Sequence, residues 1–406
     1  MNLESYLDEL RQAGALDSHG RFTLDQARAL EKLRRYQVEN PEWYSLALVS
    51  SAVAADASRI DLECNYGRFF MRHDGRSFSF EELATLFSSL VLGGTDSRHA
   101  PSRELATGLN ALGKLSPRSV RVVSSDSKTL VTLTMDPKNL LVGQDPSGGF
   151  ESYSESGFST TVEVIGVRRS FWSRLMSLVQ GALPEVKALR QRCCFAPVPV
   201  FFGEELLNPT STLPSVTAVV TTLDAGRLPL RHDQPLLQLQ REAPGAFQGF
   251  VALVPEQPSS ITLVVRGVSF EVGSLDFPTS GLRAMIQCSE LAKDLSQTRL
   301  VEGESYEQVL TWIREAVERL LLELVEVVGQ VPGERRLAAA ELMDSFAKAY
   351  LKTWKGELAT KILTGVRALR EISRDSNQLR QWADSYEALG LKEESSHYRQ
   401  RSIAYL

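Results

Sequence analysis

The chain has 406 residues, of which 43% are hydrophobic and 23% are charged, and its formal net charge is −5. This length predicts two to four domains with cores large enough to need no disulfide or metal support. Because 45 Lys and Arg residues face 50 Asp and Glu residues, the composition excludes a strongly basic binder of nucleic acids or anionic membranes. Four scattered cysteines exclude a disulfide framework and indicate a reducing compartment.

Targeting and membrane signals are missing from the sequence. The N-terminus is acidic and lacks the basic and apolar stretches of a signal peptide. The most apolar predicted helical stretch, residues 320–328, contains two glutamates and cannot supply the ~20 apolar residues that a membrane span needs. We therefore expect a soluble, cytoplasmic protein with neither a membrane nor a nucleic acid as partner.

In chain order, the first 57 residues are predicted to be mainly helical. Residues 23–26 fit a capping box, and apolar residues then recur at helical spacing until Asn40-Pro41 interrupts the pattern. Strand and helix patterns alternate from there to about residue 200. The predicted elements are a helix over 41–57, a strand within 59–71, a turn at 73–76, a helix over 79–92, a loop over 93–102, a helix over 104–112, strands at 119–124, 130–135 and 160–167, and helices over 171–180 and 185–192.

The remainder of the chain changes character twice. Residues 198 to about 286 are rich in strands, and everything after Glu304 is helical, with Gly390 dividing the last segment into two helices. The fold class is therefore an α/β block, an α+β block and an all-α tail. The predicted units are an N-terminal helical extension over 1–22, a first domain over 23–200, a middle domain over 201–303 and a C-terminal helical domain over 304–406.

Motifs for metal or covalent chemistry are absent from the sequence. The five histidines are isolated, and the cysteines lack metal-ligand spacing. The adjacent pair Cys193-Cys194 is typical of a buried element end rather than of a redox pair. There is no nucleophile elbow, P-loop or dinucleotide-binding glycine pattern. We expect no metal site.

One order of elements does carry a resemblance. The helix over 41–57 leads into a strand, then into Asp74-Gly75 on a turn, a helix, a polar loop, and a helix near Gly108. This order resembles the GHKL (Bergerat-type) ATP-binding fold, an α/β sandwich, over residues 23–200. The best matching pieces are 47–56, 72–76 and 159–164.

The resemblance implies ATP or ADP as the ligand. In that fold an aspartate accepts a hydrogen bond from the adenine amine, and a glycine lets the base approach the backbone. The nucleotide-binding residues that it implies in this chain are Asp74, Gly75, Ser51, Gly108, Asn110 and Thr160.

A segment further along narrows the resemblance. Residues 288–298 are similar to the catalytic loop in the middle domain of the heat-shock-protein-90 family. Residues 195–200 resemble a strand near the end of that family's nucleotide domain. With the landmarks in the same order, the chain resembles a distant, degenerate relative of this family.

The positions that would carry ATP hydrolysis differ from that family. Its catalytic glutamate corresponds to Ala47, its magnesium-holding asparagine to Ser51, and its phosphate-contacting arginine to Gln297. Phosphoanhydride hydrolysis needs a positioned water, a metal ion and cationic charge at the transferred group. These losses predict a pseudo-ATPase that lacks effective hydrolysis and has no clear site for magnesium.

Two features near the implied site keep two interpretations each. Asp74 either binds adenine or is structural, since Asp-Gly is a common turn dipeptide. The loop at 93–98, with Arg98 and the nearby Arg103, is either a retained lid over the phosphates or a solvated loop.

The helical tail has no counterpart in the nucleotide-binding match. Residues 382–398 resemble part of a tetratricopeptide repeat, which cannot bury its own face and must pack on other helices or on another subunit. The apolar face of residues 309–328 is a candidate homodimer interface. The tail's aromatic residues belong either to the core or to a groove for a partner peptide. They are Trp354, Trp382, Tyr386 and Tyr398.

These features support a chaperone-like or scaffold protein with a degenerate nucleotide pocket, which acts by binding a protein partner or client. Two alternatives stay open. One is a working ATPase with a relocated catalytic residue, for which Asp56, Glu104 and Arg299 are candidates. The other is a regulatory module that is switched by a bound nucleotide.

Overall fold

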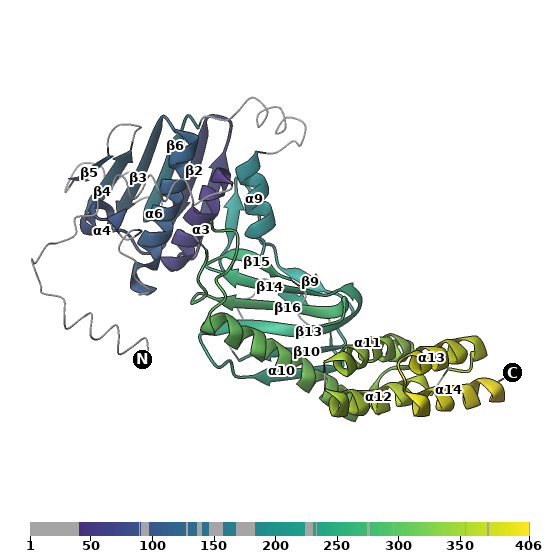
Figure 1. Ribbon diagram of the computed structural model, residues 1–406. Coiled ribbons are helices and arrows are strands. Elements are labelled where there is room, and N and C mark those ends of the chain that lie inside the picture. Colours follow the sequence, from purple (N-terminus) through teal and green to yellow (C-terminus); the bar gives the residue numbers. More distant parts are fainter. Residues whose placement is uncertain are drawn as a thin grey trace, which may run out of the picture.

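The computed structural model describes residues 40–88, 90, 97–126, 129–135, 140–145, 157–167, 183–223, 230–232, 234–273, 277–294, 296–353, 355–371 and 373–405. These residues form a mixed α/β protein in which two mixed sheets are followed by a helical region (Figure 1). The predicted order of an α/β block, a strand-rich block and a helical tail is therefore confirmed. The predicted extension over 1–22 and the predicted helix over 171–180 lie outside the described residues.

The first sheet has eight strands among the described residues: β1 (Ile60–Cys64), β2 (Arg68–His73), β3 (Ser119–Ser125), β4 (Leu130–Met135), β5 (Leu140–Asp145), β6 (Thr160–Ile165), β7 (Val200–Phe202) and β8 (Glu205–Leu206). Their order is β5-β4-β3-β6-β2-β1-β7-β8. Neighbours are antiparallel except β1 and β7, which are parallel. The strands β7 and β8, which begin at the predicted boundary at residue 200, pair with this sheet.

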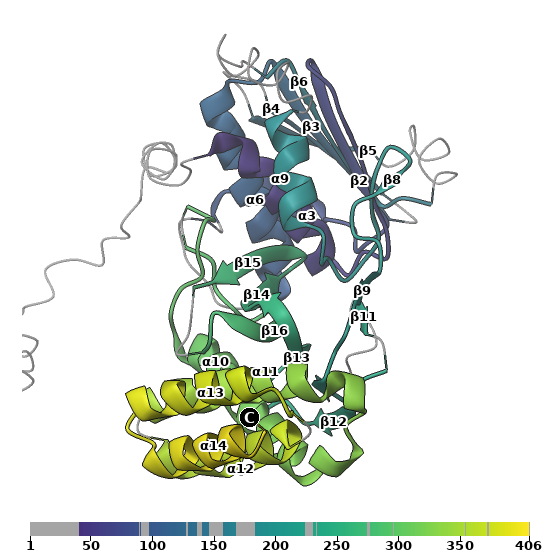
Figure 2. The same cartoon turned by 90° about the vertical axis from the view of Figure 1, so that its right-hand side faces the viewer.

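Helices cover one face of the first sheet (Figure 2). They are α3 (Tyr44–Ala54), which follows the 3-10 helix η1 (Pro41–Trp43), α6 (Ala100–Leu112) and α9 (Pro184–Arg192). The helix predicted over 104–112 begins earlier because Pro101 stands in its first turn, where a fixed φ favours helix initiation. The helix predicted over 79–92 is represented by the short α4 (Phe80–Ala84), which Ser79 and Glu82 begin with a capping box.

The second sheet has six strands among the described residues: β10 (Ala218–Thr222), β12 (Leu237–Arg241), β13 (Phe247–Pro258), β14 (Ser260–Val265), β15 (Val268–Val272) and β16 (Ser280–Cys288). Their order is β12-β10-β13-β16-β14-β15, with parallel pairs at β12–β10 and β16–β14. The strands β9 (Ser211–Leu213) and β11 (Leu230–His232) form a separate parallel pair.

Helix α10 (Glu304–Glu326) lies across the second sheet (Figure 1). Trp312 anchors it, since its indole donates to the Glu242 carbonyl oxygen at 3.2 Å and its ring meets that of Phe247 edge-on at 5.5 Å. The face proposed as a dimer interface is therefore largely covered by the same chain, so a homodimer would need a different surface. No helix of the described residues is long and apolar enough to cross a membrane.

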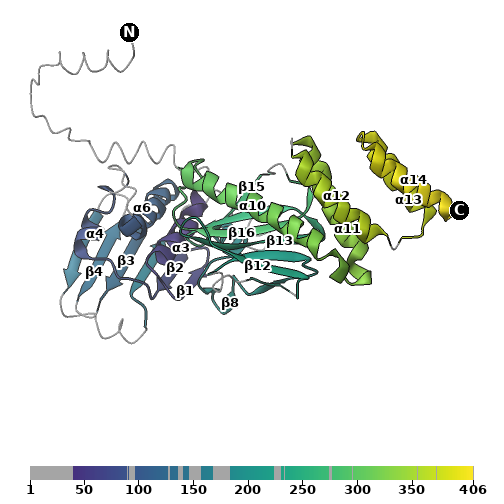
Figure 3. The same ribbon diagram turned by 90° about the horizontal axis from the view of Figure 1, so that it is seen from below.

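The C-terminal helices form two hairpins beyond the second sheet (Figure 3). They are α11 (Gly333–Lys352) with α12 (Gly356–Arg370), and α13 (Ser376–Ala388) with α14 (Lys392–Ala404). The predicted break at Gly390 is confirmed, and its φ of 77° suits glycine. Trp382, Tyr386 and Tyr398 are buried, which confirms their interpretation as core, whereas Trp354 lies outside the described residues.

The two hairpins are joined by a buried charge. The Arg370 guanidinium, 1% exposed, lies 4.1 Å from the Trp382 ring centroid. It donates to the Asp344 carboxylate at 3.2 Å and to the Tyr386 hydroxyl at 2.8 Å, and that hydroxyl donates to Asp344 at 2.6 Å. Lys348 also pairs with Asp344, at 2.8 Å. Because a buried guanidinium is tolerated only when it is paired, Asp344 specifies how the second hairpin docks on the first.

We predict that Asp344→Ala loosens the second hairpin. The free energy of opening α13 and α14 should fall by about 3 kcal/mol because Arg370 loses its buried counter-charge. Hydrogen exchange of the α13 and α14 amides measures this change. Glu341→Ala is the matched control, since Glu341 is an exposed carboxylate on the same helix. Equal protection in both variants would show that Asp344 does not hold the hairpins together.

Candidate functional site

Two of the predicted site residues, Gly108 and Ser51, lie in the contact between α3 and α6. A Cβ on Gly108 would come 3.1 Å from the nearest α3 atom, so glycine permits the close approach of the two helices. Ala47 and Ser51 are buried, and the Ser51 hydroxyl donates to the Pro101 carbonyl oxygen at 2.9 Å. Asn110 is fully buried. The polar group of Ser51 is thus used to join the helices.

The predicted adenine-binding turn packs against the end of α3. The Asp74 carboxylate accepts from the backbone amides of Ser58 and Arg59 at 2.8 and 2.9 Å, and from the Ser58 hydroxyl. Partial burial would raise the pKa of Asp74, but these bonds hold it below its usual value. A Cβ on Gly75 would come 2.6 Å from the Ala55 carbonyl oxygen, so glycine is required there. This geometry favours a structural role for the Asp-Gly pair.

Buried polar groups in the first sheet lie next to the turn. His73 is 1% exposed, its Nδ1 accepts from the Gly75 amide at 3.2 Å, and burial lowers its pKa to about 4. Thr160 stands opposite His73 in the β2–β6 register, and its hydroxyl shares a 2.9 Å hydrogen bond with that of Ser124. The structure therefore brings Thr160 next to the turn, with its hydroxyl bonded within the sheet.

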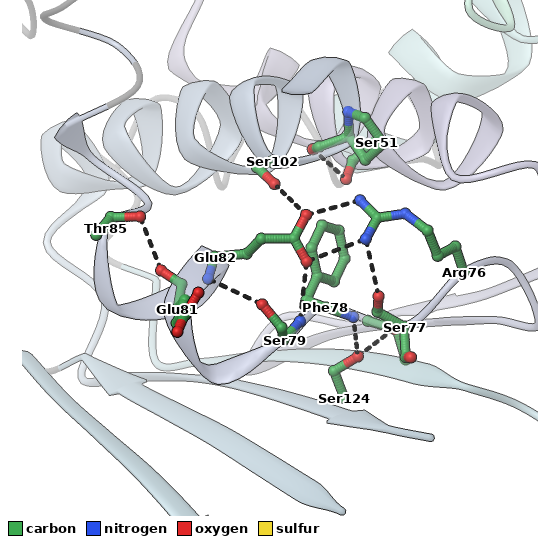
Figure 4. A network of polar contacts seen from close by, with 12 residues as sticks. Ser51, Arg76, Ser77, Phe78, Ser79, Glu81, Glu82, Thr85, Ser102 and Ser124 are labelled. Atoms are coloured by element: carbon green, nitrogen blue, oxygen red, sulfur yellow. Dashed lines mark hydrogen bonds and ion pairs between the residues drawn. The ribbon is translucent and has the colours of Figure 1, made fainter. Parts of the chain in front are cut away.

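A polar network lies beside the turn, between α4 and α6 (Figure 4). Arg76 donates to both oxygens of Glu82 at 3.0 and 2.8 Å. Glu82 also accepts from the Ser79 amide at 2.9 Å and from the Ser102 hydroxyl at 3.4 Å. Burial would raise the pKa of Glu82, but Arg76 and Ser79 hold it below its usual value. The network fastens α4 to the first turn of α6.

Two cavities open where the first domain meets the second sheet. We call the first of them the mouth cavity; its volume is about 730 Å³, and Arg76, Glu82, Pro101 and Arg266 are among its lining residues. We call the second the junction cavity; its volume is about 710 Å³, and Asp56 and Arg266 line both cavities. Of the described residues around these two cavities, none belongs to the six that the resemblance assigns to the nucleotide.

The charged residues near the predicted lid divide between the surface and α6. Arg98 is exposed and lines the mouth cavity, and Arg103 is half-buried on α6. Residues 93–96 of the predicted lid lie outside the described residues.

The loop that resembles a catalytic loop folds back on itself around Asp294. Gln297, at the position of the family's arginine, has a φ of 58° and donates from its side chain to the Asp294 carbonyl oxygen at 3.1 Å. Its amide group is therefore used within the loop. Arg299 is exposed and lines a third cavity, so it does not share a cavity with Asp56.

A buried group of charges joins the two domains, and we call it the junction triad: Glu104, Lys293 and Arg266. The Glu104 carboxylate accepts from Lys293 at 3.0 Å and from Arg266 at 3.0 Å. Lys293 also donates to the Ser50 hydroxyl on α3 at 2.7 Å. The three side chains are 6%, 4% and 11% exposed, in that order. The loop thus does reach the first domain, through its lysine.

The two cations keep the buried carboxylate ionised. Burial by itself would raise the pKa of Glu104, but Lys293 and Arg266 hold it below its usual value. Sequence reasoning considered Glu104 only as a relocated catalytic residue and missed both cations. No local pattern distinguishes Lys293 from a solvated lysine, because its partners Glu104 and Ser50 are 189 and 243 residues away.

Comparisons with known proteins do not show what kind of site this is. No protein-family model matches the chain, and no curated protein sequence matches it. Across the described parts of the chain, no three or more His, Cys, Asp or Glu side chains are grouped so that they could hold a metal ion. The function is therefore argued from the fold and from the junction triad.

We predict that Glu104→Gln weakens the junction between the domains. The variant leaves Lys293 and Arg266 buried without a counter-charge, which should lower the free energy of unfolding by about 3 kcal/mol. Urea unfolding measures the loss, and limited proteolysis measures the opening of the junction. Glu290→Gln is the matched control, since Glu290 is an exposed carboxylate at the mouth cavity. Two variants of equal stability and equal protease resistance would contradict the role of the triad.

We also predict a histidine contribution to the pH dependence of stability. His73 has a pKa of about 4 in the folded chain and 6.5 as its ordinary value, so the unfolded chain takes up its proton first as the pH falls. The contribution of His73 to the free energy of unfolding is fully present above the ordinary pKa of 6.5 and is lost as the pH falls toward 4. Between about pH 7 and pH 5 the loss should be about 2 kcal/mol. Urea unfolding should show a smaller loss over this range in His73→Gln.

Proposed function

We propose that this protein is a chaperone-like or scaffold protein of the GHKL type, related to the heat-shock-protein-90 family, which acts by binding protein partners. The junction triad is the observation that carries the proposal. In the resembled family, a cation from the middle-domain loop meets the nucleotide's γ-phosphate. Here the cation of the corresponding loop, Lys293, meets the protein's own carboxylate, Glu104.

The arrangement of the first domain supports the GHKL assignment. A mixed sheet with helices on one face, an Asp-Gly turn directly after β2, a short capped helix and then α6 follow in the order that the resemblance requires. The loop after β16 contacts that domain through Lys293, as the resemblance leads us to expect of a middle-domain loop. Each landmark is common alone, and their shared order supports the proposal.

The chemistry of these positions supports a pocket without hydrolysis. Ala47 has no group that could activate water, Ser51 is bonded to a carbonyl oxygen, and Gln297 is bonded within its loop. Phosphoryl transfer depends on base, metal and cationic charge acting together. Removing one electrostatic partner typically slows such a step by roughly 10²–10³-fold, so the loss of all three leaves little activity.

Partner binding is assigned to the middle domain and the helical tail. The second helical hairpin contacts the first through Tyr386 and Trp382. Successive hairpins in contact are the arrangement of tetratricopeptide-like arrays, and such arrays bind partners along their surfaces. Apolar side chains are exposed on the last hairpin: Leu389, Ile403 and Tyr405 are 39%, 69% and 45% exposed. This end of the tail is the surface we assign first to a protein partner.

The two alternative functions make different demands on this geometry. A relocated general base must be free to accept a proton, whereas Glu104 is already paired with two cations. A nucleotide switch needs Asp74 to exchange its bonds to Ser58 and Arg59 for a bond to adenine. Glu104 and Asp74 do not meet these demands in the arrangement described, which favours the scaffold. Asp56, an exposed carboxylate that lines the mouth and junction cavities, is the candidate that this argument leaves for a relocated base.

We predict that the purified protein hydrolyses ATP no faster than buffer does. A coupled phosphate-release assay with and without magnesium measures this rate. Asp74→Asn serves as the paired variant, and it should change neither the rate nor the binding of a protein partner. Isothermal calorimetry with ATP and ADP on both proteins separates the alternatives.

Each alternative has its own signature in these measurements. Hydrolysis that Asp74→Asn abolishes would establish a working ATPase. Binding of ATP or ADP that is indifferent to magnesium and lost in Asp74→Asn, without hydrolysis, would establish a nucleotide switch. The scaffold function requires that no ATP hydrolysis and no binding of ATP or ADP be detected.

A further inference from the structure

The third cavity, about 690 Å³, lies where three parts of the chain meet. Its walls come from the end of α9, from strands β14 and β15, and from the segment that leads into α10. We call it the Arg192 cavity. Its volume is within the range of small-molecule binding sites in proteins.

Arg192 is held rigidly at the α9 side of this cavity. Its guanidinium lies between two aromatic rings, 4.9 Å from the Trp43 centroid and 4.5 Å from the Phe270 centroid. Its Nε donates to the Ser269 carbonyl oxygen at 2.6 Å. Its Nη2 is buried and has no hydrogen-bond partner among the described residues. The fixed guanidinium therefore has a donor that the protein does not use.

A second unused donor belongs to the same cavity. Ser269 is 6% exposed, and its hydroxyl has no nitrogen or oxygen partner among the described residues; the side chain it interacts with is the Cys194 thiol, which lines the same cavity. Buried polar groups without a partner are rare because they lose their bonds to water and gain nothing in return. Two such donors at one cavity indicate an acceptor that is not part of the chain.

The charges around the cavity restrict that acceptor. Arg299 is an exposed lining residue, and so are Glu271 and Glu302. With Arg192, the lining carries two positive and two negative side chains. A dianion such as phosphate would be repelled by the two glutamates, whereas a singly charged carboxylate is balanced by Arg192.

The remaining lining residues favour a ligand whose carboxylate is attached to an apolar group. Aromatic and aliphatic side chains line the cavity between its charged residues. They are Phe195, Phe270, Val272, Leu300 and Tyr306. A positive group on the same ligand would face the exposed glutamates.

We propose that the Arg192 cavity binds a carboxylate ligand with an apolar body, which accepts hydrogen bonds from Arg192 Nη2 and from the Ser269 hydroxyl. Two sources supply this chemistry: the C-terminal residue of a peptide, and a free apolar amino acid. The peptide source rests on the partner-binding function proposed above, and the free acid does not. The cavity joins both domains, so its ligand also stabilises their junction.

Equilibrium dialysis of the full chain, read by mass spectrometry, tests this site. The probes are a pool of hexapeptides that end in leucine or phenylalanine with a free carboxylate, the same pool with amidated C-termini, and free L-leucine and L-phenylalanine. The free-carboxylate pool should be retained and the amidated pool should not. Retention of the free amino acids alone would support the site and assign it to a small acid.

Two variants identify the residues that receive the carboxylate. Ser269→Ala should weaken retention about 10-fold with little change in the stability of the chain, because the hydroxyl loses only its weak interaction with the Cys194 thiol. Arg192→Gln should weaken it about 100-fold. Arg190→Gln is the matched control, since Arg190 on the same helix pairs with Glu205 and is not among the residues lining this cavity.

Other outcomes overturn the site. They are equal retention of the free and amidated pools, no retention of any probe, or retention that Ser269→Ala and Arg192→Gln leave unchanged. In these cases water accepts the hydrogen bonds of the two donors. The ATP measurements on the same protein test the scaffold function separately, so failure of one inference is distinguishable from failure of the other.

Discussion

The junction triad is the interaction on which the arrangement of the first two domains depends. A carboxylate and two cations leave water together, and any one of them would be strongly unfavourable alone. Glu104 meets Lys293 and Arg266 when the loop after β16 and the β14–β15 turn both face α6, so the pairing selects one relative position of the two sheets. That position also creates the mouth cavity and the Arg192 cavity, because both have walls from each domain.

An internal carboxylate and a bound phosphate make different kinds of bridge. A ligand holds two domains together in proportion to its concentration and affinity, so the bridge is conditional. Glu104 is part of the chain, and its effective concentration at Lys293 is set by the fold alone. The domains are then held together whether or not a nucleotide is present. Such a constant arrangement suits a protein that presents one surface to a partner, and it does not suit a cycle driven by hydrolysis.

The predictable parts of this fold are those with a local signal. The hairpin β3–β4 follows from alternating apolar residues, and Gly390 ends a helix because its φ is positive. The pattern over 59–71 predicts a strand there, but it does not show the turn that divides this stretch into β1 and β2. Strand β16 has no separate local signal within the strand-rich stretch, since it lies between β13 and β14 and its burial depends on both neighbours. The first sheet continues to Leu206 because β7 pairs with β1 from much earlier in the chain. Lys293 was missed for the same reason, since its burial is decided by helices of another domain.

The junction contains cations in two opposite states. Lys293 and Arg266 have a carboxylate from the chain, and their hydrogen bonds account for the charge that they bring into the interior. Arg192 is fixed by Trp43, Phe270 and a carbonyl oxygen, yet its Nη2 has no acceptor among the described residues. A fold that needed Arg192 for stability alone could place a carboxylate beside it, as it does beside Lys293. The acidic lining residues Glu271 and Glu302 are exposed, and Glu271 attracts Arg192 electrostatically without accepting a hydrogen bond from its Nη2. A cation whose Nη2 has no acceptor, in a cavity beside cations that have one, is what distinguishes a place for a ligand from a structural contact.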